Sequence, residues 1–409
     1  MLAAPSRDWS VFKQIFADHW EPFQHAHSRY HTPYDAGLVA KRLACGTPDK
    51  IGYIESRCLH WGQGKHRVAM RCQSSLCLRC ATVHGDTWVS QVSQVLHEGG
   101  IYRHLIRTVP AMFRTTFYQN AAVVLRAFMR CGAQCLDDFY SEVRGKALRG
   151  GYIVVLHTHG RNGQYHPHLH VIATSGGDDG QQARWEHVPS LPSALLRRQW
   201  QWHLLTMLRQ TLQTEAVKRL GETCFTKYPD GLGTNVQKGQ VPAQYQSLAR
   251  YGAQDVVSPP IAVWRLDRYE GHRVTYHYRS HRTERVEHAT VDVETFIGRM
   301  VPHTGPQGFK RMRSDGVQAT KTLAKVQVAI QAALAQVEGV VKGAVQIIAR
   351  LTYRQRYEQS TGRDPFRCPY CQCEMEVWRI WHPTSGGIYD EGEVIKPGTY
   401  ASSAQRAGP

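Results

Sequence analysis

The chain has 409 residues, which is enough for one large core or two to three smaller ones. Lysine and arginine outnumber aspartate and glutamate by 50 to 33, and the resulting net charge of +17 is spread along the chain. This excess favours a polyanionic partner, most simply nucleic acid, over a basic protein without one. No apolar signal segment or membrane-spanning stretch is visible, so we expect a cytoplasmic protein with no membrane partner.

Cysteines dominate the first quarter of the chain. Aromatic and aliphatic residues at helical spacing predict a helix over residues 8–23, and a region rich in cysteine and histidine follows. There, Cys77 and Cys80 form a Cys-x-x-Cys knuckle, and Cys72 precedes it by five residues. Clustered cysteines indicate zinc in a reducing cytosol rather than disulfides, and tetrahedral zinc needs four ligands. We expect Cys72, Cys77 and Cys80 with Cys58 or a nearby histidine; buried free thiols are the alternative.

A strand over residues 101–108 and a long helix over 115–140 lead to a β-hairpin at residues 151–175. Its second strand carries His168 and His170 on either side of Leu169, so alternation directs both imidazoles to one face. His157 lies near the end of the first strand, close enough to complete a three-histidine cluster. The alternative is a set of half-exposed strand histidines with no ligand.

The following segment mixes helices and short strands. A helix over residues 192–213 precedes short strands at 224–228 and 233–237. This order predicts an α+β fold, with an antiparallel sheet that has helices on one side. A further helix over residues 240–257 has an apolar stripe from which Tyr251 points away. A tyrosine so placed is either a surface residue or a reactive one.

The last third begins with three predicted strands and a helix over residues 293–300. A basic stretch at 309–313 either lies along phosphates or is a solvated surface run. Helices are expected over 317–355, and the glycine-, serine- and alanine-rich tail from 396 is expected to be disordered. Between them lies a second candidate zinc knuckle, whose alternative is a turn without metal. Its proposed ligands are Cys368, Cys371, Cys373 and His382.

Three imidazoles leave positions open on a bound metal for substrate or water. Such a site could activate a hydroxide against a small molecule, hold a structural ion, or polarise a scissile phosphate while a side chain attacks. The third use accounts for both the net charge and Tyr251. A phenol is mostly protonated at neutral pH, and nearby cationic groups favour its phenolate during attack.

Several short motifs occur together in a specific order. They are CGT at Cys45, SLCLRC at 75–80, LHT at 156–158, HPHLH at 166–170, SLARY at 247–251, GFKRMR at 308–313 and CPYC at 368–371. In this order they resemble the HUH-type rolling-circle transposases of the IS91 insertion-sequence group. The resemblance runs from the first helix to about Asp315, with the CPYC turn similar to that family's tail.

The resemblance implies that the protein nicks one DNA strand at an element end, forms a 5′-phosphotyrosine and transfers the strand without an acidic triad. His168 and His170 match the HUH pair, and Tyr251 matches the catalytic tyrosine. His157 has the position of a third metal-binding histidine, with Gln254 or Asp255 as the alternative. We expect Mg²⁺ or Mn²⁺ at the histidines, Zn²⁺ at the cysteines and single-stranded DNA as partner. The expected DNA-binding residues are Arg250, Lys310, Arg311 and Arg313.

Two departures from the family pattern are visible. Ser247 stands where two-tyrosine members have their first tyrosine, and Trp61 stands where a second knuckle cysteine is frequent. The chain is therefore similar to a single-tyrosine variant. We expect a zinc module over residues 1–95, an HUH nuclease domain over 96–315, a helical and zinc-knuckle region over 316–395 and a tail over 396–409. The alternatives are an HUH relaxase or replication initiator, and a non-catalytic zinc-dependent DNA-binding protein.

Overall fold

The computed structural model describes residues 10–60, 64–72, 74–78, 80, 92, 96, 102–179, 185–236, 260–280, 283–319 and 352–394. The chain divides into two compact units. The larger unit comprises Met1–Arg7 and His84–Ala349, and the smaller unit comprises Asp8–Val83 and Arg350–Pro409. Among the described residues no helix is long and apolar enough to span a membrane.

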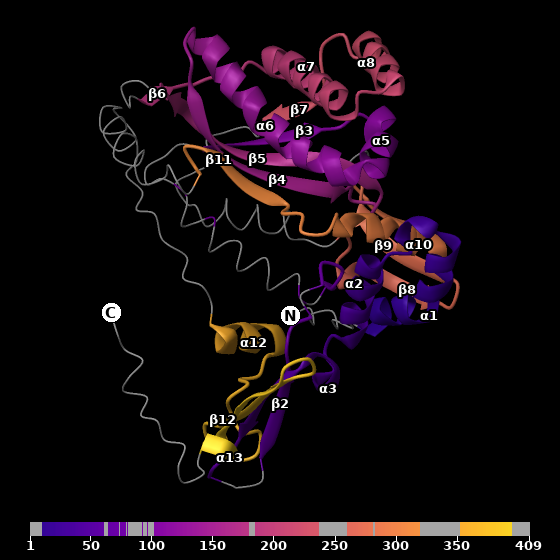
Figure 1. The fold of residues 1–409 in the computed structure, drawn as a ribbon, viewed down its shortest axis with the longest axis vertical. Coiled ribbons are helices and arrows are strands. Elements are labelled where there is room, and N and C mark those ends of the chain that lie inside the picture. The colour runs from indigo at the N-terminus through magenta and orange to yellow at the C-terminus, as the bar shows by residue number, and fades with distance from the viewer. Residues whose placement is uncertain are drawn as a thin grey trace. The chain divides into compact units, whose positions relative to one another are not determined.

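The larger unit is built on a sheet with strand order β11-β4-β5-β3-β7, in which β6 also pairs with β5. Every pairing is antiparallel. The longest strands, β4 and β5, form the predicted hairpin and lie near the middle of the sheet (Figure 1). The strands are β3 (Tyr102–Thr108), β4 (Arg149–His159), β5 (Tyr165–Asp178), β6 (Trp185–His187), β7 (Thr234–Val236) and β11 (Met312–Gly316).

Helices pack on one face of this sheet and form the main core with it (Figure 1). The helix over Ala121–Arg144 approaches the sheet closely at Gly132, where an added Cβ would lie 2.6 Å from Leu169 Cδ1. A side chain at this position would therefore push the helix away from the sheet. The mixed helical and antiparallel architecture predicted from the sequence is confirmed. The helices are α5 (Arg114–Gln119), α6 (Ala121–Arg144), α7 (Ser193–Leu212) and α8 (Glu215–Lys227).

One predicted strand is wrong, because residues 224–227 belong to α8. Thr214 caps this helix by accepting a hydrogen bond from the backbone N–H of Val217. Val217, Gly221 and Cys224 then recur at helical spacing and bury one face. The cap and this spacing outweigh the strand-like composition of the segment. The predicted helices at 240–257 and over most of 317–355, and the predicted disordered tail, lie outside the described residues.

A three-stranded antiparallel sheet and the helices that follow it contact the turn of the β4–β5 hairpin within the same unit. The hydroxyl of Tyr276 donates to the backbone oxygen of Asn162 over 2.8 Å. His303 is buried, and its Nε2 lies 3.2 Å from the oxygen of Gly163 while its Nδ1 lies 3.0 Å from Thr158 Oγ1. The hairpin tip is therefore held by two side chains, Tyr276 and His303, which bond to its backbone oxygens. The elements are β8 (Leu266–Glu270), β9 (Arg273–Arg279), β10 (Val286–Asp292), α10 (Val293–Met300) and the short helix η4 (Val301–Thr304).

The smaller unit joins the two ends of the sequence in one sheet of order β13-β12-β1-β2. β12 pairs antiparallel with β1, from Tyr53↔Trp381 to Arg57↔Glu376. Backbone pairing therefore joins β1, from the predicted module over 1–95, to β12, from the predicted region over 316–395, within one compact unit. The elements are α1 (Ser10–Ala26), α2 (Pro33–Ala44), α3 (Pro48–Ile51), β1 (Tyr53–Arg57), β2 (Lys65–Ala69), α12 (Tyr353–Thr361), β12 (Glu376–His382), β13 (Gly386–Asp390) and α13 (Glu391–Val394).

Candidate metal centres

The three predicted histidines meet on the face of the larger sheet opposite the helices. His157 on β4 pairs directly with His168 on β5, and His170 follows two residues later. Leu169, between the two β5 histidines, is fully buried in the core beneath the helices. Because side chains alternate along a strand, the histidines lie on the other face. The hairpin register therefore brings together three side chains from two strands.

The ligand nitrogens of these histidines lie within 4.8 Å of one another. His157 is 6% exposed and His170 is 7% exposed, so the group is largely shielded from water. Nε2 of His157 is buried and has no hydrogen-bond partner among the described residues. Leaving such an atom unsatisfied costs about 1–3 kcal/mol. A divalent cation bound by the three imidazoles would satisfy this nitrogen, so the donor set fits a metal.

Burial favours the neutral form of all three imidazoles. Burial is the largest cause of a lowered pKa in each ring. It lowers the pKa of His170 to about 2, holds the pKa of His157 well below the usual histidine value, and lowers the pKa of His168 below that value. A neutral imidazole keeps the lone pair that coordination requires. The group is therefore ready to bind a cation without first releasing protons.

Two neighbouring groups orient the β5 histidines. Nδ1 of His168 lies 2.8 Å from the backbone oxygen of His166, to which it donates a proton. Nδ1 of His170 lies 3.0 Å from Nε2 of His104, a buried residue on β3. In both cases Nε2 remains to bind a metal, which is the usual role of a second hydrogen bond on a ligand histidine. The sequence analysis did not identify His104. The pattern that could have identified it is its alternation with the core residue Leu105 on the adjacent strand β3.

Replacing His104 with phenylalanine is expected to weaken Mn²⁺ binding at the cluster by about 10- to 100-fold, because outer hydrogen-bond partners of metal ligands have effects of this size. Phenylalanine retains a ring stacked on His170 but cannot accept its proton. Mn²⁺ titration followed by electron paramagnetic resonance measures the change. The matched control is His187→Phe on β6, outside the cluster. Equal affinity in the wild type and His104→Phe would show that His104 only fills space.

Basic side chains lie beside this cluster, as a site for phosphate requires. Burial is the main cause of the low His157 and His168 pKa values, and the charges of Arg311 and Arg114 respectively lower them further. Nε of Arg114, on α5, is buried without a hydrogen-bond partner in the described part of the chain. Arg311 was predicted from the basic stretch, whereas Arg114 was not.

The other predicted DNA-binding residues differ in their placement. Lys310 is exposed just before β11. Arg313 pairs across the sheet with Val154, on the helix-covered face, and forms an ion pair with Asp315. Strand alternation thus turns Arg313 away from the histidines, and its contact with DNA stays a prediction.

Part of the predicted site lies outside the described residues. This part comprises Tyr251, Arg250, Ser247 and the alternative metal ligands Gln254 and Asp255.

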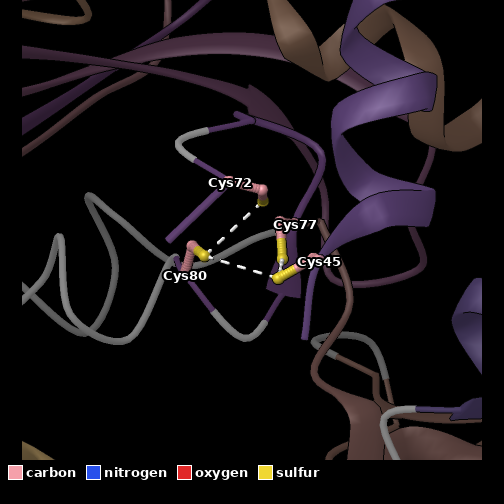
Figure 2. Close-up of side chains that lie close together, drawn as sticks. All are labelled: Cys45, Cys72, Cys77 and Cys80. Carbon is pink, nitrogen blue, oxygen red and sulfur yellow. Dashed lines mark hydrogen bonds between the residues drawn. The ribbon is translucent and has the colours of Figure 1, made fainter. Parts of the chain in front are cut away.

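Four buried cysteines form a separate group in the smaller unit: Cys45, Cys72, Cys77 and Cys80 (Figure 2). Their sulfurs lie 3.5 Å apart for Cys45 and Cys77, 3.6 Å for Cys72 and Cys80, and 3.8 Å for Cys45 and Cys80. Thiolates about 2.3 Å from a tetrahedral zinc ion would be about 3.8 Å from one another. The arrangement therefore has the dimensions of a four-cysteine zinc site.

Cys45 takes the fourth place in this group, where the sequence analysis expected Cys58 or a nearby histidine. It directly follows α2 as its C-terminal cap and so approaches the Cys77–Cys80 turn from another element. The sequence analysis did not group Cys45 with Cys72 because the two residues are far apart in sequence, although Cys45 belongs to the CGT motif. Cys58 belongs to a different group.

A second group of cysteines consists of Cys58, Cys368 and Cys371, whose sulfurs lie within 4.8 Å of one another. Cys371 also lies within this distance of Cys373 and of His60. The remaining predicted ligand, His382, is in neither group. Its Nδ1 accepts hydrogen bonds from the backbone N–H and hydroxyl of Thr384. The structure therefore groups Cys368 and Cys371 with Cys58 and leaves His382 outside that group.

Two family models match the chain. Residues 151–325 match one described as "Putative transposase", and this segment includes the histidine hairpin. Residues 15–109 match the IS91 model described as "Transposase zinc-binding domain". The Cys45, Cys72, Cys77 and Cys80 group lies within that second segment, and this match supports Zn²⁺ in the N-terminal part of the chain.

Two curated proteins are similar along most of their length. The "Putative transposase y4qJ" of Sinorhizobium fredii is 26% identical over 394 residues, covering 91% of this chain and 96% of that protein. The "Transposase for insertion sequence element IS801" of Pseudomonas savastanoi pv. phaseolicola is 25% identical over 353 residues, covering 82% of each chain. No solved structure matches significantly. Both family models and both relatives carry transposase descriptions, and together they support an IS91-family transposase.

Proposed function

We propose that this transposase has an HUH nuclease fold and nicks and rejoins single-stranded DNA at insertion-sequence ends by rolling-circle transposition. In this proposal Tyr251 forms a 5′-phosphotyrosine with the cleaved strand. The observation that carries the proposal is the convergence of His157, His168 and His170, with a buried and unpartnered nitrogen on His157. A hairpin that presents three neutral imidazoles beside arginines is suited to hold a phosphate for attack.

DNA is the partner that the composition and the relatives support together. The net charge of +17 favours a polyanion, and both similar proteins carry the name transposase. Arg114 and Arg311 would bind non-bridging oxygens of the scissile phosphate, because both lie near the histidines. Phosphate neutralisation releases counterions, so affinity for DNA should fall steeply with salt.

His157, His168 and His170 would hold the divalent cation through Nε2. Once bound, Mg²⁺ or Mn²⁺ would withdraw electron density from the phosphate and stabilise charge that develops during cleavage. His104 and the backbone oxygen of His166 keep two of the rings in the binding orientation. The role of these residues is therefore to fix the phosphate in one place before attack.

The chemical step exchanges one phosphate ester for another. The Tyr251 oxygen bonds to phosphorus as its proton leaves to solvent, and the bond from phosphorus to the 3′ oxygen breaks. The 3′ oxygen gains a proton, so one strand ends in a hydroxyl and the other is esterified to Tyr251. Since the ester conserves the bond, a 3′ hydroxyl can attack it and rejoin DNA without ATP. With Ser247 in place of a second tyrosine, each subunit would hold one such ester at a time.

The test is to incubate the full chain with labelled single-stranded oligonucleotides that cover the element ends, and to map any adduct by mass spectrometry. Weakly bound metal is first removed with a chelator, and Mg²⁺, Mn²⁺ or Zn²⁺ is then added back separately. We expect an adduct on Tyr251 with Mg²⁺ or Mn²⁺. No adduct with any metal would overturn the proposed mechanism, and an adduct restored by Zn²⁺ alone would overturn the metal assignment.

A further inference from the structure

The Cys58, Cys368 and Cys371 group has the character of a built site. Cys58 is 2% exposed and Cys368 is fully buried. The sulfurs of Cys58 and Cys371 are 3.4 Å apart, although these residues are separated by 313 positions in sequence. Thiols that converge from distant segments with such spacing are typical of zinc ligands in a reducing compartment.

Strand pairing explains how the two ends of the chain meet here. Arg57, the last residue of β1, pairs with Glu376, the first residue of β12. Cys58 directly follows Arg57, and the Cys368–Cys373 turn shortly precedes Glu376. The cysteines from both segments are therefore delivered to the same end of the β1–β12 ladder.

The C-terminal cysteines lie on a tight turn of the kind that presents two sulfurs to one ion. The backbone N–H of Gln372 donates to the oxygen of Cys368, and that of Cys368 donates to the oxygen of Cys373, each over 3.0 Å. Gln372 has a φ of 60°, a conformation that closes the turn at a cost to its backbone.

Gly64, which directly precedes β2, packs against the same cysteines. The backbone N–H of Cys58 donates to the oxygen of Gly64 over 2.8 Å. A Cβ added at Gly64 would lie 3.1 Å from the Cys368 sulfur and 3.1 Å from the Cys58 Cβ. Glycine therefore allows the backbone to approach the sulfurs closely, which leaves them enclosed on this side.

We propose that a second zinc ion binds in the smaller unit, held by Cys58, Cys368 and Cys371 and completed by Cys373 or His60. These two residues are the candidates for the fourth ligand, because the ligand atom of each lies within 4.8 Å of the Cys371 sulfur. The ion would tie the N-terminal zinc module to the C-terminal segment and stabilise the β1–β12 pairing. This inference does not depend on the proposed strand-transfer chemistry.

Zinc content of the purified full chain, measured by inductively coupled plasma mass spectrometry, tests the proposal. We expect two zinc ions per wild-type chain, and one in each of Cys58→Ser, Cys368→Ser and the double variant. The double variant loses no more than either single variant because both residues bind the same ion. Cys45→Ser should also retain one ion, and Cys45→Ser combined with Cys58→Ser should retain none. Cys224→Ser, a buried cysteine outside both groups, is the matched control and should retain two.

Two zinc results would overturn the proposal. One is a wild-type chain with a single ion and an unchanged count in Cys58→Ser. The other is loss of both ions from the double variant, Cys58→Ser with Cys368→Ser, when each single variant loses one ion and all three variants remain folded by circular dichroism. That result would place the two cysteines at different ions. The fourth ligand is tested separately by competition with a chromogenic chelator. If neither Cys373→Ser nor His60→Ala weakens zinc binding, completion by these residues is wrong.

Alkylation of the wild-type chain provides a measurement that needs no variant to fold. We expect Cys58, Cys368 and Cys371 to resist iodoacetamide together and to become labelled together after a strong chelator is added. Labelling released by reductant without chelator would identify a disulfide between two of these cysteines. Labelling of the three with neither addition would identify free thiols. Either result would overturn the second zinc site.

Discussion

Replacing Tyr251 with phenylalanine is expected to abolish covalent attachment to single-stranded DNA and to reduce nicking by at least about 10⁴-fold, as loss of a covalent nucleophile does in other enzymes. Phenylalanine keeps the ring but lacks the oxygen that would bond to phosphorus. Affinity for the same oligonucleotide should remain close to wild type, because binding depends on cationic side chains. Denaturing gels measure the adduct, and fluorescence anisotropy measures affinity.

The matched control for this change is Tyr245→Phe, which removes a phenol oxygen six residues earlier in the same predicted helix. Tyr245 belongs to the predicted apolar stripe, so this variant should nick and form adducts at the wild-type rate. An adduct that persists in Tyr251→Phe and disappears in Tyr245→Phe would move the nucleophile to Tyr245. Nicking that persists in both variants without an adduct would indicate hydrolysis by water rather than tyrosine attack.

The histidine hairpin could be predicted because its signals are local. Alternation around Leu169 sets the face of His168 and His170, and a short connection limits where His157 can lie. Antiparallel pairing then places His157 opposite His168. Even the orienting role of His104 follows from the same alternation, but only once β3 is known to neighbour β5. Strand order is a tertiary property, and no local pattern in residues 102–108 indicates it.

The cysteine groups show the corresponding limit. The Cys77–Cys80 knuckle was visible because both ligands lie in one turn. Cys45 and Cys58 are similar in sequence terms, since each is a single cysteine upstream of the knuckle. Only the C-terminus of α2 and the pairing of β1 with β12 decide which cysteine joins which group. The spacing of cysteines in the sequence therefore indicated zinc as the metal, but it could not assign the ligands that distant segments contribute.

Replacing His170 with alanine is expected to remove Mn²⁺ binding at the cluster and to reduce nicking by more than the roughly 10- to 100-fold loss that an outer-shell change produces. The reason is that His170 would bind the cation directly and is held by His104 on one side. Its ring centroid also lies 4.2 Å from that of His157 and 5.1 Å from that of His168, so its loss opens the cluster. Metal titration and adduct formation measure the two effects.

His159→Ala is the matched control, because His159 lies on the same strand as His157 and its ring centroid is 5.8 Å away, but it is outside the metal-binding group. This variant should retain Mn²⁺ affinity and most of the nicking activity. The contrast also separates the two kinds of metal site, since zinc content should be unchanged in both variants. If His170→Ala nicks DNA at the wild-type rate, the histidine cluster is not the catalytic metal site. If it instead loses zinc in step with activity, the cluster holds zinc and not Mg²⁺ or Mn²⁺.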